Sequence, residues 1–476
     1  MIDTYATARE MLADLAAKEV SARELLEAHV DRNDEIEARI NAVVETDILR
    51  AQKDAAAIDE ARARGEALGP LAGVPMTIKD AYDVENMPAT SGNPALKDRA
   101  KDCADAATVA AARRAGAVIW GKTMVPFMLG DIQSYNAMHG TTNNPYDVAR
   151  TPGGSSGGAA AALACGVTPL EIGTDIGGSL RHPANFCGVT ALKPTWGAVS
   201  NRGMVPPLPE RYLEVDLNVC GPMARDVGDL KLLWSVLRGT PERSRRDVAG
   251  ARIALWNEEA AWPLAREVKA GTVRAADALA RAGAHVEHAK PDIDGGALMQ
   301  FYMALLSVAV ARDFPPAMLD AWEAMRADDK QIVAAGGPEA AGAAYRLAAT
   351  APYRDIDDAR VRQQWHKDKL AEFFTRYDAI VMPIAMVPAF AHQQAGGFTD
   401  RILDVDGTPT PYSAILDWIS PATALYAPAL AVPAGQTAQG LPVGVQIVGP
   451  WHGEDRLFDY AFAVEEGTGG FRRPLL

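Results

Sequence analysis

Apolar and polar positions alternate between helical and extended spacing along the chain. Residues 5–17 carry apolar positions at helical spacing. Ser21 and Glu24 have the spacing of a capping box and predict the start of a second helix. Asn41–Thr46 predicts a short strand, and a helix rich in alanine and charged residues then extends to about Arg64. We therefore expect a largely helical N-terminal region.

A strand that ends in a lysine follows. In the segment GVPMTIKD, residues 73–80, every second residue is valine, methionine or isoleucine, which is the spacing of a strand. Lys79 closes this apolar run, where a charged residue is unusual. The pattern then predicts a helix over 108–115 and a strand over 117–120. Residues 122–153 are rich in Asn, Gly, Pro and Thr and are interpreted as a long irregular loop.

Helical and extended patterns keep alternating toward the C-terminal end. Helices are expected over 159–164 and 225–238, and strands over 252–256, 377–383 and 440–449. Residues from about 257 to 375 are rich in Ala, Arg and Glu and predict a helical region that covers the sheet. Because no internal repeat or low-complexity linker interrupts the sequence, we interpret 1–476 as a single large α/β domain with a central mixed β-sheet covered by helices.

The composition indicates a globular protein without a surface for nucleic acid or membrane. The 476 residues carry 47 Lys and Arg against 61 Asp and Glu, a formal charge of −14, and contain no long basic run. Nucleic acids and anionic membranes are therefore not expected as main partners. The N-terminus lacks the apolar core of a signal peptide, no apolar run reaches membrane-spanning length, and the four cysteines are widely spaced. These features predict a cytoplasmic protein with reduced thiols and no structural zinc site.

The segment Thr151–Pro194 contains two serine clusters flanked by glycine. They are GGSSGG at 153–158 and GGS at 177–179, and such glycines let backbone N–H groups turn toward a ligand. Three uses of such clusters fit poorly. An α/β-hydrolase elbow needs a buried strand before its serine, but turn residues precede Ser155. No serine is followed by lysine three positions on, as in β-lactamase-type enzymes, and no phosphate-loop lysine follows either cluster.

A fourth interpretation combines the serines with the lysine. Ser179 would be the nucleophile, Ser155 a proton relay and Lys79 the base. Burial lowers the pKa of a lysine, so a lysine at the end of an apolar strand can be neutral and accept a proton. His182 is the histidine nearest in sequence to Ser179. It is interpreted as a local residue or a residue of the rim, without a role in a catalytic triad, because no acid is placed to orient it.

Several motifs together resemble the amidase signature family. They are GVPMTIKD at 73–80, NPYD at 144–147, GGSSGG at 153–158, GTDIGGSLR at 173–181, CGVTALKPT at 187–195, YDAIVMP at 377–383 and GLPVGVQIVG at 440–449. The resemblance covers most of the chain, and the spacing from Ser155 to Ser179 suits the family. It implies the amidase signature fold, with a signature core at about 70–225, and a hydrolase that acts on carbon–nitrogen bonds other than peptide bonds.

The resemblance also implies a role for each site residue. Ser179 would form the acyl-enzyme and Ser155 would relay protons to Lys79, with an unusual, often cis, peptide bond beside Ser155. The oxyanion hole would consist of the backbone N–H groups of Ile176, Gly177, Gly178 and Ser179. The residues that support this loop would be Ser156, Asp175 and Arg181. No metal or organic cofactor is implied, since nucleophile and base are both side chains.

The loop 122–140 departs from the common pattern of the family. Phe127, Met128, Leu129 and Gly130 stand where many relatives carry a glutamate and small polar residues. We expect Met128, Leu129 and Gly130 to line the substrate pocket with an apolar wall, which would favour a hydrophobic or aromatic group. Burial of these residues in the core is an equally good interpretation.

Other residues bear on the same pocket. The segments Met204–Leu208 and Trp418–Tyr426 are expected to add apolar lining. His182 stands where an aliphatic residue is common in the family, which would alter the pocket rim. Cys187 raises the alternative of a nitrilase-like thiol enzyme, but its apolar surroundings favour a buried, unreactive side chain.

The predicted activity is that of a stand-alone serine hydrolase of small-molecule amides. Aryl or hydrophobic amides, carbamates and esters are the candidate substrates, and the resemblance allows a homodimer. The alternative is a glutaminase-type component of an amidotransferase assembly that hands ammonia to a partner. The acidic charge and the apolar loop argue against that alternative. A catalytically silent binding protein is disfavoured by the complete set of Lys79, Ser155 and Ser179.

Overall fold

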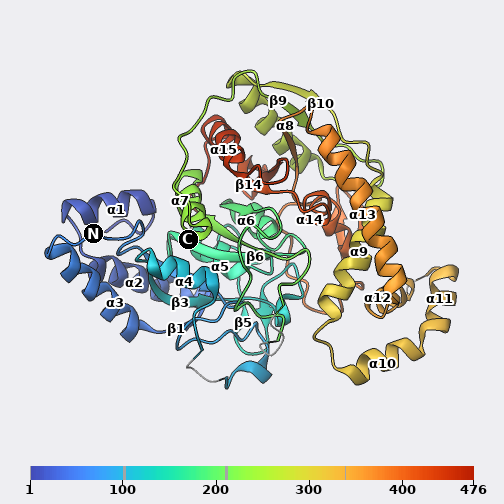
Figure 1. Cartoon of the computed structure of the whole chain (residues 1–476), viewed down its shortest axis with the longest axis horizontal. Helices are drawn as coiled ribbons and strands as arrows, with labels where there is room; N and C mark the ends of the chain where they lie inside the picture. Colours follow the sequence, from blue (N-terminus) through green and yellow to red (C-terminus); the bar gives the residue numbers. More distant parts are fainter. Residues whose placement is uncertain (1, 100–102, 209–212, 338, 476) are drawn as a thin grey trace.

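An eight-stranded mixed sheet forms the centre of the computed structural model, which describes residues 2–99, 103–208, 213–337 and 339–475 (Figure 1). The strand order is β10-β9-β11-β15-β14-β7-β8-β6. β9 pairs in parallel with β10 and β11, and the other neighbours are antiparallel. The strands are β6 Leu170–Asp175, β7 Thr190–Lys193, β8 Val219–Ala224, β9 Arg252–Leu255, β10 His285–His288, β11 Ala379–Pro383, β14 Ala429–Gln436 and β15 Pro442–Val448. The predicted α/β class with a central mixed sheet is confirmed. Met1 and Leu476, the limits of the predicted domain, lie outside the described residues.

The central sheet is buried on both faces. Along β11, Ile380 and Met382 pack into one core cluster, while Ala379 and Val381 pack into another on the opposite face. Such two-sided burial explains why these strands appear in the sequence as continuous apolar runs. The helices that accompany the sheet are α4 Ala107–Arg114, α5 Gly157–Ala164, α6 Arg181–Cys187, α7 Val227–Arg238, α8 Arg266–Arg281, α14 Ser420–Ala424 and α15 Glu454–Thr468.

Lys79 belongs to a second, smaller sheet rather than to the central one. The order of this sheet is β1-β3-β2, with β2 parallel to β3 and β1 antiparallel to it. Its strands are β1 Val43–Thr46, β2 Pro75–Lys79 and β3 Val118–Thr123, and the helices before and after β1 are α1 Ala8–Ala17, α2 Ala22–Ile40 and α3 Ile48–Ala63. The capping box predicted at Ser21 and Glu24 is present. β2 also packs directly against β6 of the central sheet, which brings the two sheets together at the lysine.

Alpha-helix α5 joins the two sheets through its small side chains. Its sequence GGAAAALA is completely buried. A Cβ on Gly158 would collide with the backbone of Met124, so the helix can approach the end of β3 this closely only with glycine there. The first two residues of the predicted loop 122–153 belong to β3, and the rest contains only short elements, β4 Tyr135–Asn136, β5 Gly140–Thr141 and a 3-10 turn at Phe127–Leu129.

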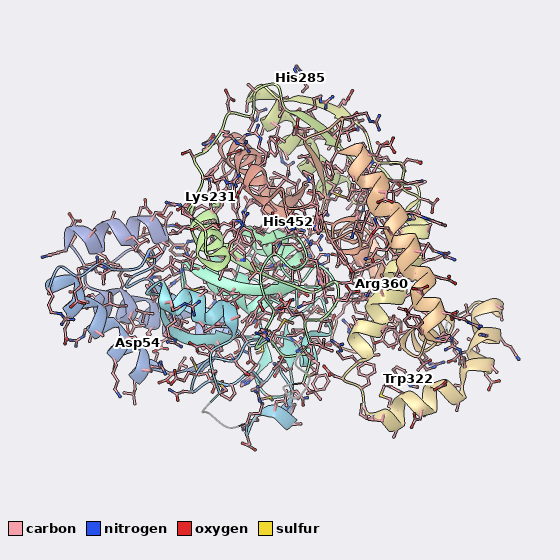
Figure 2. All side chains as sticks on the ribbon, viewed as in Figure 1. Asp54, Lys231, His285, Trp322, Arg360 and His452 are labelled. Carbon is pink, nitrogen blue, oxygen red and sulfur yellow. The ribbon has the colours of Figure 1, made fainter. Side chains whose placement is uncertain are left out.

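The region 257–375 is mostly helical, as predicted. Its helices are α8, α9 Gly295–Ala311, α10 Pro316–Ala324, α11 Arg326–Ala335, α12 Ala340–Ala349 and α13 Tyr353–Phe373. The edge strand β10 interrupts it, and its mostly exposed HVEH sequence gave no apolar alternation to predict a strand. α10–α12 extend away from the central sheet (Figure 1). Trp322 of α10, labelled in Figure 2, packs its ring edge against Phe314 and Tyr345 at 5.6 and 5.9 Å between ring centroids.

A third, two-stranded sheet precedes the last part of the central sheet. It consists of β12 Ile402–Val405 and β13 Thr408–Pro411, followed by the 3-10 helix η3 Tyr412–Leu416. Over the described part of the chain, no helix has both the length and the apolar character needed to cross a membrane.

Candidate active site

Lys79 lies at the centre of a buried cluster of hydroxyl groups. Its Nζ is 2.8 Å from the Oγ atoms of Ser155 and Ser156 and 2.6 Å from Oγ1 of Thr174. β2 ends at the lysine, and Thr174 comes from β6. Burial lowers the pKa of Lys79 to about 7, although nearby carboxylates oppose this shift. A neutral amine that can accept a proton is therefore accessible near neutral pH.

A tight turn before α5 places Ser155 against the lysine. The Gly154–Ser155 peptide bond is cis, the feature expected beside this serine, and Gly153 has a φ of +89°. A Cβ on Gly154 would lie 2.6 Å from the backbone nitrogen of Gln133, so a larger residue does not fit. Ser134 Oγ donates a hydrogen bond to the Gly153 carbonyl oxygen at 3.0 Å. The positive φ of Gly153 and the close contacts of Gly154 therefore explain why this turn contains glycines.

Ser179 lies next to this cluster and is nearly buried, with 4% of its surface exposed. Its carbonyl oxygen accepts the N–H of Ser156 at 3.3 Å. In the described part of the chain, however, its Oγ makes no hydrogen bond to Ser155. Contacts between catalytic groups often tighten only when substrate binds. The structure thus brings Lys79 and Ser155 into direct contact and places Ser179 beside them.

The turn Ile176–Ser179 differs from the prediction at Gly178. The Gly178 N–H donates to Asp175 Oδ1 at 2.9 Å, so it supports the turn instead of pointing to a substrate oxygen. Within the described residues, the N–H groups of Ile176, Gly177 and Ser179 have no hydrogen-bond partner. Gly178 has a φ of +88°, which glycine adopts without strain. Three of the four expected donors therefore remain free at the turn.

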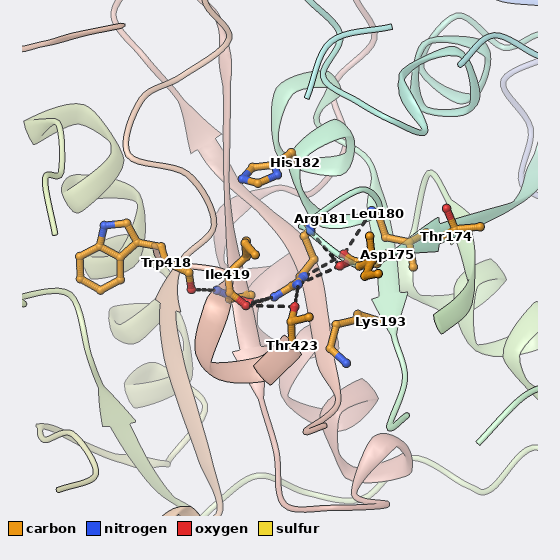
Figure 3. Close-up of polar contacts among 12 residues, drawn as sticks. Thr174, Asp175, Leu180, Arg181, His182, Lys193, Trp418, Ile419 and Thr423 are labelled. Atoms are coloured by element: carbon orange, nitrogen blue, oxygen red, sulfur yellow. Dashed lines mark hydrogen bonds and ion pairs between the residues drawn. The ribbon is translucent and has the colours of Figure 1, made fainter. Parts of the chain in front are cut away.

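Asp175 and Arg181 form a fully buried ion pair behind the turn (Figure 3). Arg181 Nε lies 3.0 Å from Oδ2, and Nη2 lies 2.9 Å from Oδ1. The remaining guanidinium hydrogens reach the Ile419 carbonyl and Gln446 Oε1, both at 2.9 Å, and Thr423 Oγ1 at 2.6 Å. Burial raises the pKa of Asp175, but the guanidinium outweighs burial and lowers it to about 2. The pair fixes the turn on which Ser179 lies.

Replacing Arg181 with methionine is expected to destabilise the fold by about 3–5 kcal/mol, because Asp175 would remain as an uncompensated buried charge. Chemical denaturation at neutral pH measures this loss. The matched control is Arg266→Met, which removes an ion pair to Asp406 from a side chain that is 87% exposed. That change is expected to cost no more than about 1 kcal/mol. Similar losses in the two variants would contradict the structural role of Arg181.

Comparison with known proteins identifies the family. The model of the amidase family matches residues 24–458. This chain belongs to the amidase signature family. It is therefore a hydrolase that acts on carbon–nitrogen bonds.

Individual relatives of this amidase cover almost its whole length. One component of the glutamyl-tRNA(Gln) amidotransferase of Moorella thermoacetica is 33% identical, and the alignment covers 98% of both chains. A crystal structure titled as an amidase superposes with a TM-score of 0.79 at 27% identity, covering 98% of this chain and all of the other. The structure of 6-aminohexanoate cyclic dimer hydrolase complexed with substrate gives a TM-score of 0.78 at 26% identity, with 99% of both chains covered.

A cavity of about 550 Å³ opens beside Ser179 of the amidase. Most of the side chains around it are apolar, and they come from the loop after β3, from α9 and α12 and from the segments around η3. The lining residues used below are Leu129, Gly130, Met303, Leu306, Val310, Tyr345, Phe398 and Leu416. Leu129 and Gly130 thus line the same cavity as Ser179, and their role in substrate binding stays a prediction. Met128 instead directs its sulfur to Asn93 Nδ2 at 3.5 Å.

Other predictions about the pocket are wrong. Met204–Leu208 lines a separate cavity of about 440 Å³ near Asp83 and Arg99. Trp418 packs edge-on against Trp262 in the core, with 5.1 Å between ring centroids. Only their apolar character had suggested these segments as lining, and the fold directs them elsewhere.

His182 is a fully buried residue of α6, so of the two predicted alternatives it is a local residue and not one of the rim. Its Nε2 lies 3.1 Å from the Ile415 carbonyl oxygen, so this nitrogen carries the hydrogen of a neutral ring. Burial lowers the pKa of His182 to about 4. Cys187 is also fully buried, and burial raises the pKa of its thiol well above the ordinary value. An unreactive Cys187 is therefore consistent with the sequence interpretation.

Two neighbours of Lys79 escaped the sequence analysis. Thr174 accepts its hydrogen bond, and Glu171 is a fully buried carboxyl group on the same strand, β6. A glutamate in the apolar run before GTDIGGS was a usable signal, because an acid is rarely buried without a partner. In the described part of the chain, no group of His, Cys, Asp and Glu side chains is arranged to hold a metal ion.

Proposed function

We propose that this amidase hydrolyses small-molecule amides with a hydrophobic or aromatic group through an acyl-enzyme on Ser179. Neutral Lys79 takes the hydroxyl proton of Ser155, which takes that of Ser179, while Ser179 Oγ bonds to the substrate carbonyl carbon. The proton then returns through Ser155 to the amide nitrogen, the C–N bond breaks and the amine leaves. Water, deprotonated by the same relay, attacks the acyl-enzyme and releases the acid.

The proposal rests on one observation: Lys79 Nζ lies 2.8 Å from Ser155 Oγ, next to a cavity that Ser179 helps to line. The free N–H groups of Ile176, Gly177 and Ser179 are proposed to stabilise the oxyanion of the tetrahedral intermediate. Each such donor contributes about 10²–10³ in rate. Gly178 is left out of this set because Asp175 already accepts its N–H.

The lining of the cavity supports the choice of substrate. Among the described residues that line the cavity, the charged one is Asp131. Its carboxylate is already paired with Arg401 at 2.8 Å and accepts a hydrogen bond from the Tyr412 hydroxyl at 2.8 Å. An apolar acyl or amine group therefore enters without leaving this charge unpaired. Carbamates and esters share the carbonyl chemistry and remain candidate substrates. We also propose that the enzyme acts in the cytoplasm.

A glutaminase-type component of an amidotransferase is the second candidate, because curated relatives such as the Moorella protein are named as parts of such an enzyme. Free glutamine carries a carboxylate and an ammonium group. No lysine or arginine side chain is among the described residues that line the cavity, so its carboxylate would enter without a cation. We therefore favour the stand-alone amidase.

A panel of substrates with one aniline leaving group and acyl groups of increasing polarity tests the proposal. We expect kcat/KM to fall by about tenfold or more when an apolar acyl group gains a hydroxyl or a charge, because the cavity offers it few partners. Glutamine hydrolysis by the pure chain, with its size measured by gel filtration, is the parallel assay. Glutamine as the preferred substrate, or activity that requires an added partner, would reverse the choice.

A further inference from the structure

Glu171 is a buried acid that the mechanism has not yet used. Its Oε1 accepts hydrogen bonds from Thr77 Oγ1 at 2.8 Å and Thr123 Oγ1 at 3.0 Å. Its Oε2 accepts the N–H of Ile172 at 3.0 Å. Burial raises the pKa of Glu171 to about 7, although these three donors favour the charged form, and among the described residues no cation forms an ion pair with it. A buried carboxylate without a cation needs an explanation.

The strands place this carboxyl group close to the proposed base. Thr77 lies two residues before Lys79 on β2, so both side chains leave the same face of that strand. On β6, Thr174 accepts a hydrogen bond from Lys79; it lies three residues after Glu171, so the alternation of the strand places these two side chains on opposite faces. Asp175 and, to a smaller extent, Glu171 favour the charged form of the lysine, and the lysine favours the charged form of Glu171.

We propose that Glu171 is a positioning residue whose carboxylate stabilises the ammonium group that Lys79 becomes when it takes the proton from Ser155. This inference rests on the proposed function, since it needs Lys79 as the base. A buried ammonium ion is costly, and the transfer from Ser155 creates one at the fully buried Lys79. The carboxylate form of Glu171 lowers the energy of that state and makes the amine a stronger base.

Of the other charged groups around Lys79, Asp175 favours the charged form of the lysine more strongly than Glu171 does, but it is committed to an ion pair. Asp175, also on β6, is paired with Arg181. On β3, Lys122 is paired with Asp80, the residue after Lys79. The neighbouring acids and bases that are neutral at pH 7 are Tyr82 and Cys220, whose pKa values burial raises, and His29 of α2, whose pKa burial lowers to about 3. α5 contributes only Gly, Ala and Leu.

The test is Glu171→Gln, which keeps the size of the side chain and removes its charge. In kcat/KM against pH, the rising limb is expected to move to lower pH by about one unit, because the ammonium form of Lys79 loses its counter-charge. The plateau is expected to fall by about threefold to tenfold, because the amine becomes a weaker base. The control is Glu454→Gln, a change at a buried glutamate that accepts the N–H of Thr195 at 2.8 Å. It is expected to leave the limb in place.

A second variant keeps the test decisive if Glu171→Gln does not fold. Thr123→Val removes one hydrogen bond to the carboxylate and therefore raises the pKa of Glu171. It is expected to shift the limb in the same direction by a smaller amount. The pH dependence of Ser179 labelling by a fluorophosphonate gives the same readout without turnover. A labelling limb that stays in place in folded variants overturns the role of Glu171 alone, whereas normal turnover by Ser179→Ala overturns the proposed function.

Discussion

Ser179→Ala is expected to abolish the burst of aniline that an anilide substrate releases from the wild-type amidase. The burst reports formation of the acyl-enzyme, and without the Oγ atom no acyl group can be held. Steady-state turnover is expected to fall by about 10⁴-fold or more, since residues of a catalytic set act as a unit. Stopped-flow absorbance measures the burst. Intact mass after incubation with a fluorophosphonate shows whether one label is lost with the hydroxyl group.

Cys187→Ala is the matched control, because it removes the other candidate nucleophile of the same segment. Cys187 is fully buried and its Sγ lies 3.4 Å from the Pro152 carbonyl oxygen, so this change is expected to preserve the burst and the label. A burst that survives in Ser179→Ala would show that the nucleophile is a different group. Loss of the burst in Cys187→Ala, with the fold intact, would point to the thiol.

Lys79, Ser155 and Ser156 of the cluster could be identified in the sequence because each lies in a short motif with its own local reason, whereas Thr174 was missed. Lys79 closes an alternating strand, and the glycines around Ser155 are required by the tight turn, where even a Cβ would meet the backbone of Gln133. The spacing of the motifs could not predict the contact of β2 with β6. These two strands are far apart in the sequence and belong to different sheets. Glu171 was missed for the same reason.

The walls of the cavity could not be predicted from the sequence. Helical periodicity in 257–375 shows that a face of α9 or α12 is apolar, but not which neighbour that face meets. Met303 and Tyr345 reach Ser179 only through the path of the chain between α9 and α12. The prediction for Met204–Leu208 failed for a different reason. These apolar residues are close in sequence to the serine motifs, but they line another cavity.

Lys79→Met is expected to lower kcat/KM by about 10²–10⁴-fold, the usual contribution of a positioned base. Methionine keeps the apolar stem in its buried channel, so the fold is expected to persist. The matched control is Lys193→Met. Lys193 is also fully buried, and burial lowers its pKa to about 7, but its Nζ donates to the Pro194 carbonyl oxygen at 2.9 Å and contacts neither serine. Its loss is expected to cost much less activity and to leave the pH profile in place.

The pH profile of the wild-type enzyme also tests whether Lys79 is the base. Only the neutral amine accepts a proton, and the pKa of Lys79 is lowered to about 7, so activity is expected to rise as the pH increases through this value and to level off above it. An ordinary lysine, with a pKa of about 10.4, would keep the enzyme largely inactive below about pH 9. Measuring kcat/KM between about pH 5 and 10 distinguishes the two cases. An optimum on the acid side would contradict Lys79 as the base, because its amine would then be almost fully protonated.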